Sequence, residues 1–248
     1  MATPLPKSSE LHTTLTAYID AGQILPEWEA AKTKREIRSI DDPLVSLQLT
    51  ALCFGAMGQE EAAIESFNEA MDSFYDPRVG KNFCTYLKRI GRNTEYLQHL
   101  YQFAEQLEDP DIVETAWDAA KVVFDYPKVC SFSRKLRKYY PNTYGENIVQ
   151  TSESFIGRLQ DLETELGVKA ADMHRLSEAC LRIATKYRKP IIGSSLGVGE
   201  GLAMICFDVD RSGPDIVSDM NHDLAMNVAE DDNLLDISAT AWFRCVEL

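Results

Sequence analysis

The feature that most constrains the fold is an Asp-Pro pair that recurs at nearly constant spacing in the first half of the chain. The pairs Asp42-Pro43, Asp76-Pro77 and Asp109-Pro110 follow one another at intervals of 34 and 33 residues. Gly58 and Gly91 lie between them, and each precedes the next proline by 19 residues. Proline ends one helix and is tolerated in the first turn of the next, while glycine permits a tight turn. A period of about 34 residues therefore predicts an array of helical hairpins.

The unit that begins at Leu44 resembles the tetratricopeptide repeat. Its large and small residues fall at the positions that this family uses, namely Leu47, Ala51, Phe54, Ala63, Phe67 and Ala70. Ala51 replaces the more usual glycine and Leu47 the more usual tryptophan, and the neighbouring units are degenerate. The resemblance covers residues 11–141. It implies an α-solenoid of roughly four hairpins, in which the first helices line a concave groove.

The helix expected over residues 78–91 has two distinct faces. Its apolar residues recur at helical spacing and should face the core; they are Val79, Phe83, Leu87 and Ile90. A second face carries the candidate partner-binding residues Arg78, Lys81, Thr85 and Lys88, with Arg89 beside them. The resemblance implies that these residues line the groove, where the family often uses cations to hold a peptide's carboxylates. We therefore expect an acidic segment of another protein to bind there. The alternative is a solvated basic face, or one neutralised by the chain's own acids.

The chain changes character after residue 141. Residues 142–154 are polar and are expected to form a linker. Residues 155–248 predict a small α+β domain, with helices packed on a mostly antiparallel sheet. The expected strands are 191–192, 202–209 and 234–246, and the expected helices are 155–166, 170–187 and 214–229. The chain is thus predicted to be multidomain and mainly α: a tetratricopeptide-like helical repeat domain over 1–141, a linker and an acidic α+β domain.

The charge balance restricts the partners. The chain has 25 Lys and Arg against 39 Asp and Glu, a net charge of −14. Residues 200–248 hold 11 acids and only Arg211 and Arg244, a net charge of −9. Such acidity argues against nucleic acid or an anionic membrane as the partner of the whole protein.

Two basic clusters remain, at Lys32, Lys34, Arg35 and Arg38 and at Arg134, Lys135, Arg137 and Lys138. The second could contact RNA, but helix dipoles explain cations at helix C-termini more simply.

Three patterns in the second half of the chain are candidate chemical sites. Gly193 to Gly201 precedes a strand and lacks the Lys-Ser/Thr ending of a phosphate loop, so we expect a hairpin or loop. An oxygen-ligand spacing typical of an EF-hand loop is present at Asp208, Asp210, Ser212, Gly213 and Asp219. A turn followed by an acid-capped helix explains the same residues, so no metal and no cofactor is expected. His222, with Asp219 nearby, is a candidate general base.

The cysteines and the apolar pattern indicate the compartment, and the features above indicate the function. The six cysteines are scattered without a C-x-x-C pair, and no signal segment or apolar run long enough for a membrane is present. We expect a cytoplasmic protein with reduced thiols and no membrane contact. The expected function is non-catalytic protein binding, as an adaptor, chaperone or regulator. The alternatives are an inhibitor or immunity-type protein that blocks a basic enzyme through its acidic domain, and an enzyme with an unrecognised site near His222. The oligomeric state is left open.

Overall fold

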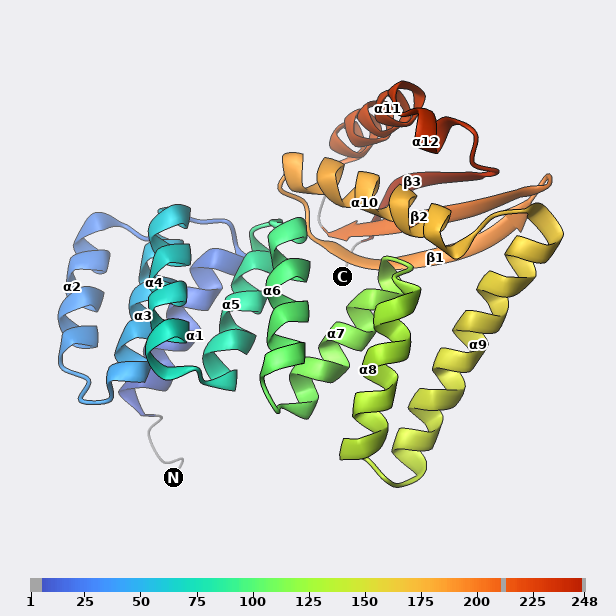
Figure 1. The fold of residues 1–248 in the computed structure, drawn as a ribbon. Helices are drawn as coiled ribbons and strands as arrows, with labels where there is room; N and C mark the ends of the chain where they lie inside the picture. Colours follow the sequence, from blue (N-terminus) through green and yellow to red (C-terminus); the bar gives the residue numbers. More distant parts are fainter. Residues whose placement is uncertain (1–5, 211–212, 247–248) are drawn as a thin grey trace, which may run out of the picture. The chain divides into compact units, whose positions relative to one another are not determined.

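The computed structural model describes residues 6–210 and 213–246, and the chain divides into two compact units, Met1–Arg89 and Ile90–Leu248. The described part is mainly helical, and its one sheet lies in the second unit (Figure 1). None of the helices in this described part is long and apolar enough to cross a membrane.

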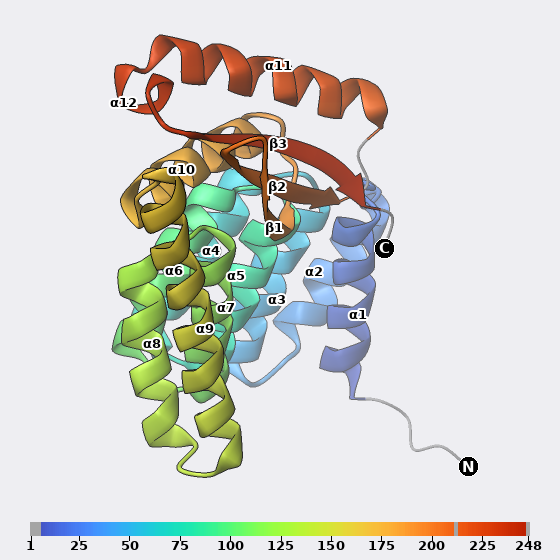
Figure 2. The same cartoon turned by 90° about the vertical axis from the view of Figure 1, so that its right-hand side faces the viewer.

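The first unit consists of five helices in its described residues. They are α1 (Lys7–Asp20), α2 (Glu27–Arg38), α3 (Pro43–Ala56), α4 (Glu60–Phe74) and α5 (Pro77–Arg89). The central helix α3 packs against α1, α2, α4 and α5 (Figure 2). The hairpin predicted between Asp42-Pro43 and Asp76-Pro77, with its turn at Gly58, is confirmed as α3 and α4.

The Asp-Pro pairs mark helix starts through the chemistry of both residues. Asp42 accepts hydrogen bonds from the main-chain N–H groups of Leu44 and Val45 at 3.0 and 3.2 Å. Asp109 accepts in the same way from Ile112 at 3.0 Å. The following proline has no N–H to lose at the first helical position, and its fixed φ suits the helix. The repeated motif therefore combines an N-cap with a preorganised first turn.

Aromatic residues form the core of the first unit. The rings of Phe67 and Phe83 stack with their centroids 5.2 Å apart, and the Tyr86 ring lies 5.5 Å from that of Phe67. Ala51 and Ala63, which the repeat pattern assigned to close helix packing, are fully buried. Gly58 adopts the left-handed conformation with φ +71°, as its predicted place in the turn between two helices requires.

The second unit begins with five helices and continues into the sheet. Its helices are α6 (Asn93–Gln106), α7 (Pro110–Val122), α8 (Tyr126–Tyr139), α9 (Thr143–Leu166), α10 (Ala170–Lys186), α11 (Pro214–Glu230) and α12 (Asp232–Leu235). The expected linker at 142–154 is wrong, because these residues form the first half of α9. Asn142 caps this helix by accepting from the N–H of Tyr144. Ile148 and Ser152 are buried one turn apart, so the segment is polar only on its outer face.

The sheet has the order β1-β2-β3 and is mixed. Strands β1 (Ile191–Gly199) and β2 (Leu202–Asp210) form an antiparallel hairpin. Its two turn residues, Glu200 and Gly201, both have positive φ, as in a tight two-residue turn. Strand β3 (Ala239–Val246) pairs with β2 in parallel, which corrects the expected mostly antiparallel sheet. The reason is the connection: α11 carries the chain back to the starting end of β2, as a parallel crossover requires. The strand expected from 234 begins at 239, since 232–235 form α12.

One core joins these helices to the sheet. Val123 and Phe124, at the turn between α7 and α8, are buried in the same apolar cluster as Leu162 of α9 and Phe207 and Phe243 of the sheet. Nearly all of α10's buried face contributes to it. The predicted boundary at residue 141 is therefore misplaced, because helices on both sides of it share a single core.

Candidate functional site

The five predicted partner-binding residues lie together on α5 in the first unit. Arg78, Thr85 and Arg89 are exposed, and Lys81 and Lys88 are half-buried. On the opposite side of the helix, Val79, Phe83 and Leu87 are fully buried, as their spacing predicted. The two faces of α5 are thus confirmed, although the chemistry of the basic face differs from the expectation at two of its residues.

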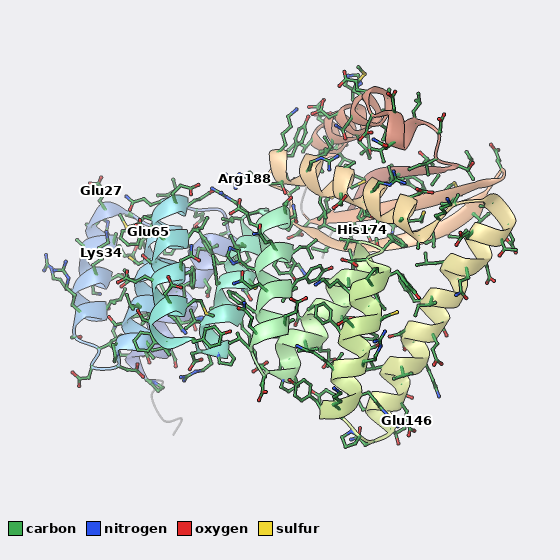
Figure 3. All side chains as sticks on the ribbon, in the orientation of Figure 1. Glu27, Lys34, Glu65, Glu146, His174 and Arg188 are labelled. Carbon is green, nitrogen blue, oxygen red and sulfur yellow. The ribbon has the colours of Figure 1, made fainter. Side chains whose placement is uncertain are left out.

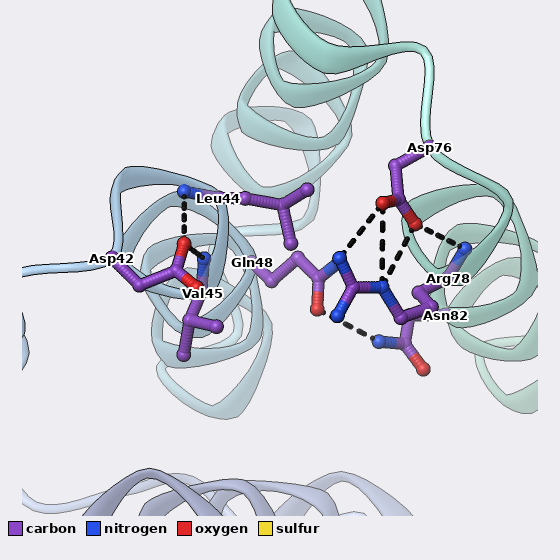
Figure 4. Close-up of polar contacts among 7 residues, drawn as sticks. All are labelled: Asp42, Leu44, Val45, Gln48, Asp76, Arg78 and Asn82. Atoms are coloured by element: carbon purple, nitrogen blue, oxygen red, sulfur yellow. Dashed lines mark hydrogen bonds and ion pairs between the residues drawn. The ribbon is translucent and has the colours of Figure 1, made fainter.

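Arg78 is held by the acid that begins its own helix. Asp76 accepts from the Arg78 N–H at 2.8 Å, and the same carboxylate receives the guanidinium through Nε and Nη2 at 3.0 and 2.8 Å (Figure 4). This guanidinium lowers the pKa of the Asp76 carboxyl below its usual value. The positive charge of Arg78 is therefore already balanced within the chain.

Arg89, at the other end of α5, is also paired. Its Nε lies 2.8 Å from Oδ1 of Asp20, at the last residue of α1. His12 lies on the same helix, and its pKa is lowered by burial and, to a smaller extent, by the charge of Arg89. Helices α1 and α5 of the first unit therefore meet through an ion pair.

An amide pair links helices α3 and α5. Asn82 of α5 donates from Nδ2 to Oε1 of Gln48 of α3 at 3.0 Å (Figure 4). Gln48 is only 8% exposed, and its Nε2 finds no acceptor among the described residues. We call the surface formed by these contacts the α1–α3–α5 face. It is defined by Asp20, Gln48, Asp76, Arg78, Asn82, Thr85 and Arg89.

The amide pair was not predicted from the sequence. It has a sequence signal, because Gln48 and Asn82 are 34 residues apart, one repeat period. Thr85, which was predicted, donates its hydroxyl to the main-chain oxygen of Lys81 at 2.8 Å and so binds its own helix.

The described calcium candidates lie on different secondary-structure elements. Asp208 lies within β2, where its carboxylate accepts from Nε of Arg244 on β3. Asp210 ends the same strand, whereas Asp219 lies within α11 and Gly213 precedes that helix. Ser212 lies outside the described residues. No group of three or more His, Cys, Asp or Glu able to hold a metal ion occurs in the part of the chain that the structure covers.

His222 lies exposed on α11. No hydrogen bond joins it to Asp219 within the described residues, and the adjacent Asp223 is held by Lys186 and Tyr187 at 2.6 and 2.9 Å. The glycine-rich segment is strand β1 and its turn, which confirms the expected hairpin and leaves no phosphate loop.

A cavity that the sequence did not suggest lies between α6, α10 and the α7–α8 turn. It has a volume of about 330 Å³, and its lining includes Leu97, Tyr101, Asp125, His174 and Glu178. His174 is the α10 residue labelled in Figure 3. Its Nδ1 lies 2.9 Å from the Val123 carbonyl oxygen, and its Nε2 lies 3.9 Å from the Glu178 carboxylate. Burial raises the pKa of Tyr101, so its phenol stays neutral. The cavity could hold a small organic molecule, but it contains no Ser, Cys or Lys as a nucleophile.

Comparison with known proteins finds no relative: no protein-family model matches the chain, and no curated protein or solved structure is significantly similar to it.

Proposed function

We propose that this chain is a non-catalytic protein-binding protein, acting as an adaptor, chaperone or regulator, that captures a partner segment on the α1–α3–α5 face. The single observation that carries the proposal is the Gln48 amide. A buried N–H donor without an acceptor costs free energy, on the order of 1–3 kcal/mol. Because this Nε2 is buried, the Gln48 side chain would have to turn outward, and a main-chain carbonyl of an extended segment would then relieve that cost beside Asn82 and Arg78.

The same proposal includes a tetratricopeptide-like array and a cytoplasmic location. The array is supported by the period of about 34 residues, by the small residues buried between helices and by the helical hairpins in sequence. The location is supported by the six cysteines, all of which are free thiols, since disulfides are typical of oxidising compartments.

An acidic segment remains the preferred partner, although the cations of α5 already interact within the chain. Arg78 and Arg89 have carboxylate partners, and Lys81 and Lys88 also make interactions of their own. A bound segment would therefore be held first by hydrogen bonds to the amide pair. Its acidic side chains would compete for Lys81 and Lys88 with the groups that these lysines already contact.

The test uses peptides selected on the full-length protein from a displayed random 16-residue library. Each enriched peptide is labelled and titrated by fluorescence anisotropy against wild type, Gln48→Leu and Lys81→Glu/Lys88→Glu. We expect about fivefold weaker binding for Gln48→Leu, the loss of one hydrogen bond of about 1 kcal/mol. The lysine reversal should weaken binding by at least tenfold.

The matched control is Arg134→Glu/Lys138→Glu on α8. It makes the same change in net charge at two exposed cations that form no ion pair within the described residues. It should bind like wild type. The proposal fails if no peptide is enriched, or if enriched peptides bind the Gln48 and lysine variants as tightly as wild type.

The inhibitor hypothesis is favoured by one specific observation. Asp219, Glu230 and Asp232, on α11 and α12, are exposed and form no ion pair within the described residues. If these acids block a basic enzyme, binding of that enzyme would survive Lys81→Glu/Lys88→Glu. It would be lost when Asp219 and Glu230 are replaced by lysine.

A further inference from the structure

The outward face of α2 carries cations that nothing in the described chain neutralises. Trp28, Lys32, Arg35 and Arg38 recur at intervals of four, three and three residues, so they lie along one side of the helix. All four are exposed, Trp28 to 72%. None of the three cations forms an ion pair or side-chain hydrogen bond within the described residues, unlike Arg78 and Arg89. We call these four residues the α2 stripe.

The helix dipole accounts for only part of this stripe. Arg35 and Arg38 lie in the last turn of α2, where positive charge is favoured. The dipole does not favour an exposed tryptophan one turn before Lys32, and Ile24, just before the helix, is also 70% exposed. Large aromatic side chains and arginines are the residues that protein interfaces concentrate. The stripe therefore has the composition of a docking surface for a partner with acidic and apolar residues.

The second unit carries a surface of the opposite sign. Asp215, Asp219, Met226 and Glu230 lie along one side of α11, because they are separated by four, seven and four residues. Asp232, Leu235 and Asp236 continue this surface along the chain, through α12 to the residue that follows it. All seven are exposed, Met226 to 48% and Leu235 to 58%.

These acids are also uncompensated. None of Asp215, Asp219 and Glu230 forms an ion pair in the described part of the chain, and the same holds for Asp232 and Asp236. Asp223, by contrast, is paired with Lys186 at 2.6 Å and lies half-buried. We call the seven residues the α11–α12 surface. It complements the α2 stripe both in charge and in its exposed apolar side chains.

We propose that the α2 stripe of one copy of this chain docks on the α11–α12 surface of a second copy. This inference is independent of the proposed function, which uses the α1–α3–α5 face. Two copies that make the contact reciprocally form a closed dimer, and copies that make it once each form a head-to-tail chain. Trp28 packs against Met226 or Leu235, and the cations face the unpaired acids.

The proposed self-association should depend on salt concentration. The net charge of −14 makes two copies repel one another at long range. At 0.15 M salt the screening length is about 8 Å, which removes most of that repulsion but leaves pairs in contact. At 1 M salt the screening length is about 3 Å, and the contact pairs are weakened as well. Association should therefore be strongest at intermediate salt.

The experiment is sedimentation velocity of the full chain at 1–100 µM protein in 0.02, 0.15 and 1 M NaCl. We expect a mass of at least twice the 27.9 kDa of one chain at 0.15 M, and smaller averages at both extremes. Two charge-reversal variants test the surfaces, Lys32→Glu/Arg35→Glu and Asp219→Lys/Glu230→Lys. Each alone should sediment as a monomer, with at least tenfold weaker self-association.

Mixing the two double variants provides the decisive comparison. In an equimolar mixture the unchanged α2 stripe of one variant can dock on the unchanged α11–α12 surface of the other, so the mixture should associate although each variant alone does not. The control Arg134→Glu/Lys138→Glu should behave like wild type, and circular dichroism should show that every variant is folded. A wild type that is monomeric at all three salt concentrations overturns the proposal, as does a mixture of folded double variants that stays monomeric while wild type associates.

Discussion

At the scale of single residues, Gly91 and Gly167 occupy positions where a side chain would be unfavourable. Gly91 precedes α6 and has φ +72°. A Cβ atom placed on it would lie 2.3 Å from the main-chain carbon of Arg188, at the end of α10. Gly167 has nearly the same conformation, with φ +73°, but nothing lies within 4 Å of its Cβ position. A side chain at Gly91 therefore carries two costs, the left-handed backbone conformation and the clash with residue 188, whereas a side chain at Gly167 carries only the first.

We expect Gly167→Ala to lower the free energy of unfolding by about 1 kcal/mol, the cost of a left-handed alanine. Gly91→Ala should lower it by about 3 kcal/mol, because main chain must also move to admit the methyl group. Urea denaturation followed by circular dichroism measures both losses. Equal losses for the two variants would show that the approach of residue 188 to residue 91 is not constrained.

His12 makes the first unit sensitive to mild acid. Burial and the nearby charge of Arg89 lower its pKa, so the folded chain binds its proton less readily than the unfolded chain. The contribution of His12 is therefore fully present above the unfolded pKa of about 6.5 and is lost as the pH falls below it. We expect the melting temperature of wild type to fall between pH 7.5 and 5.

The variant His12→Gln isolates this effect. It cannot take up a proton, so its melting temperature should fall less over the same range, as measured by differential scanning fluorimetry. His222→Gln is the control, because that histidine is exposed on α11. Its profile should follow wild type. A His12 variant with an unchanged slope would contradict the explanation.

At the scale of secondary-structure elements, the Asn221 side chain joins α11 to strand β3 by hydrogen bonds. Its Oδ1 accepts from the Phe243 N–H at 2.7 Å, and its Nδ2 donates to the Phe243 carbonyl oxygen at 3.1 Å. Strand β3 is at the end of the sheet order, so one of its sides has no strand partner in the described sheet. The amide takes the place of a neighbouring strand at this residue and limits pairing with other chains.

Replacing Asn221 with alanine should lower the free energy of unfolding by about 2 kcal/mol, since two hydrogen bonds are lost and Phe243 is buried. It should also raise aggregation on heating, measured by light scattering. Asn227→Ala on the same helix is the comparison. Its only described hydrogen bond is a long one of 3.5 Å to Arg182, so it should cost less than about 0.5 kcal/mol. Similar losses for both variants would refute the role of Asn221.

The elements differ in how far the sequence determines them. The helices around Asp42, Gly58 and Asp76 were predictable, because N-caps, proline and glycine act within a few residues. The direction of β3 was not, since its pairing depends on where α11 crosses the sheet. The basic face of α5 was predictable, and its neutralisation by the chain's own acids stood as the alternative, but the sequence did not identify Asp76 and Asp20 as the acids. Asp76 lies two residues before Arg78, so that pair is local, whereas Asp20 is brought to Arg89 only by the packing of α1.

At the scale of the whole molecule, the division into units follows buried contacts and not composition. Polar residues at 142–154 suggested a boundary, yet they belong to a helix of 24 residues. Asn93 shows how firmly α6 is tied to the sheet. It is 2% exposed, donates to the carbonyl oxygen of Lys189 at 2.9 Å and accepts from the N–H of Ile191 at 3.0 Å. The first residue of strand β1 is thus hydrogen-bonded to a side chain 98 residues earlier in the chain.

This organisation predicts how the chain can be cut. A fragment of residues 142–248 would lose Asn93, Val123 and Phe124, and with them buried packing on α10 and the sheet. The side chain of Ser194 in β1 would also lose the Val122 carbonyl oxygen that it contacts at 2.8 Å. We expect this fragment to show helical circular dichroism without a cooperative thermal transition, and to bind a hydrophobic dye. A fragment of residues 90–248 keeps all of these contacts and should unfold cooperatively. Cooperative unfolding of residues 142–248 at the same temperature as the longer fragment would restore residue 141 as the domain boundary.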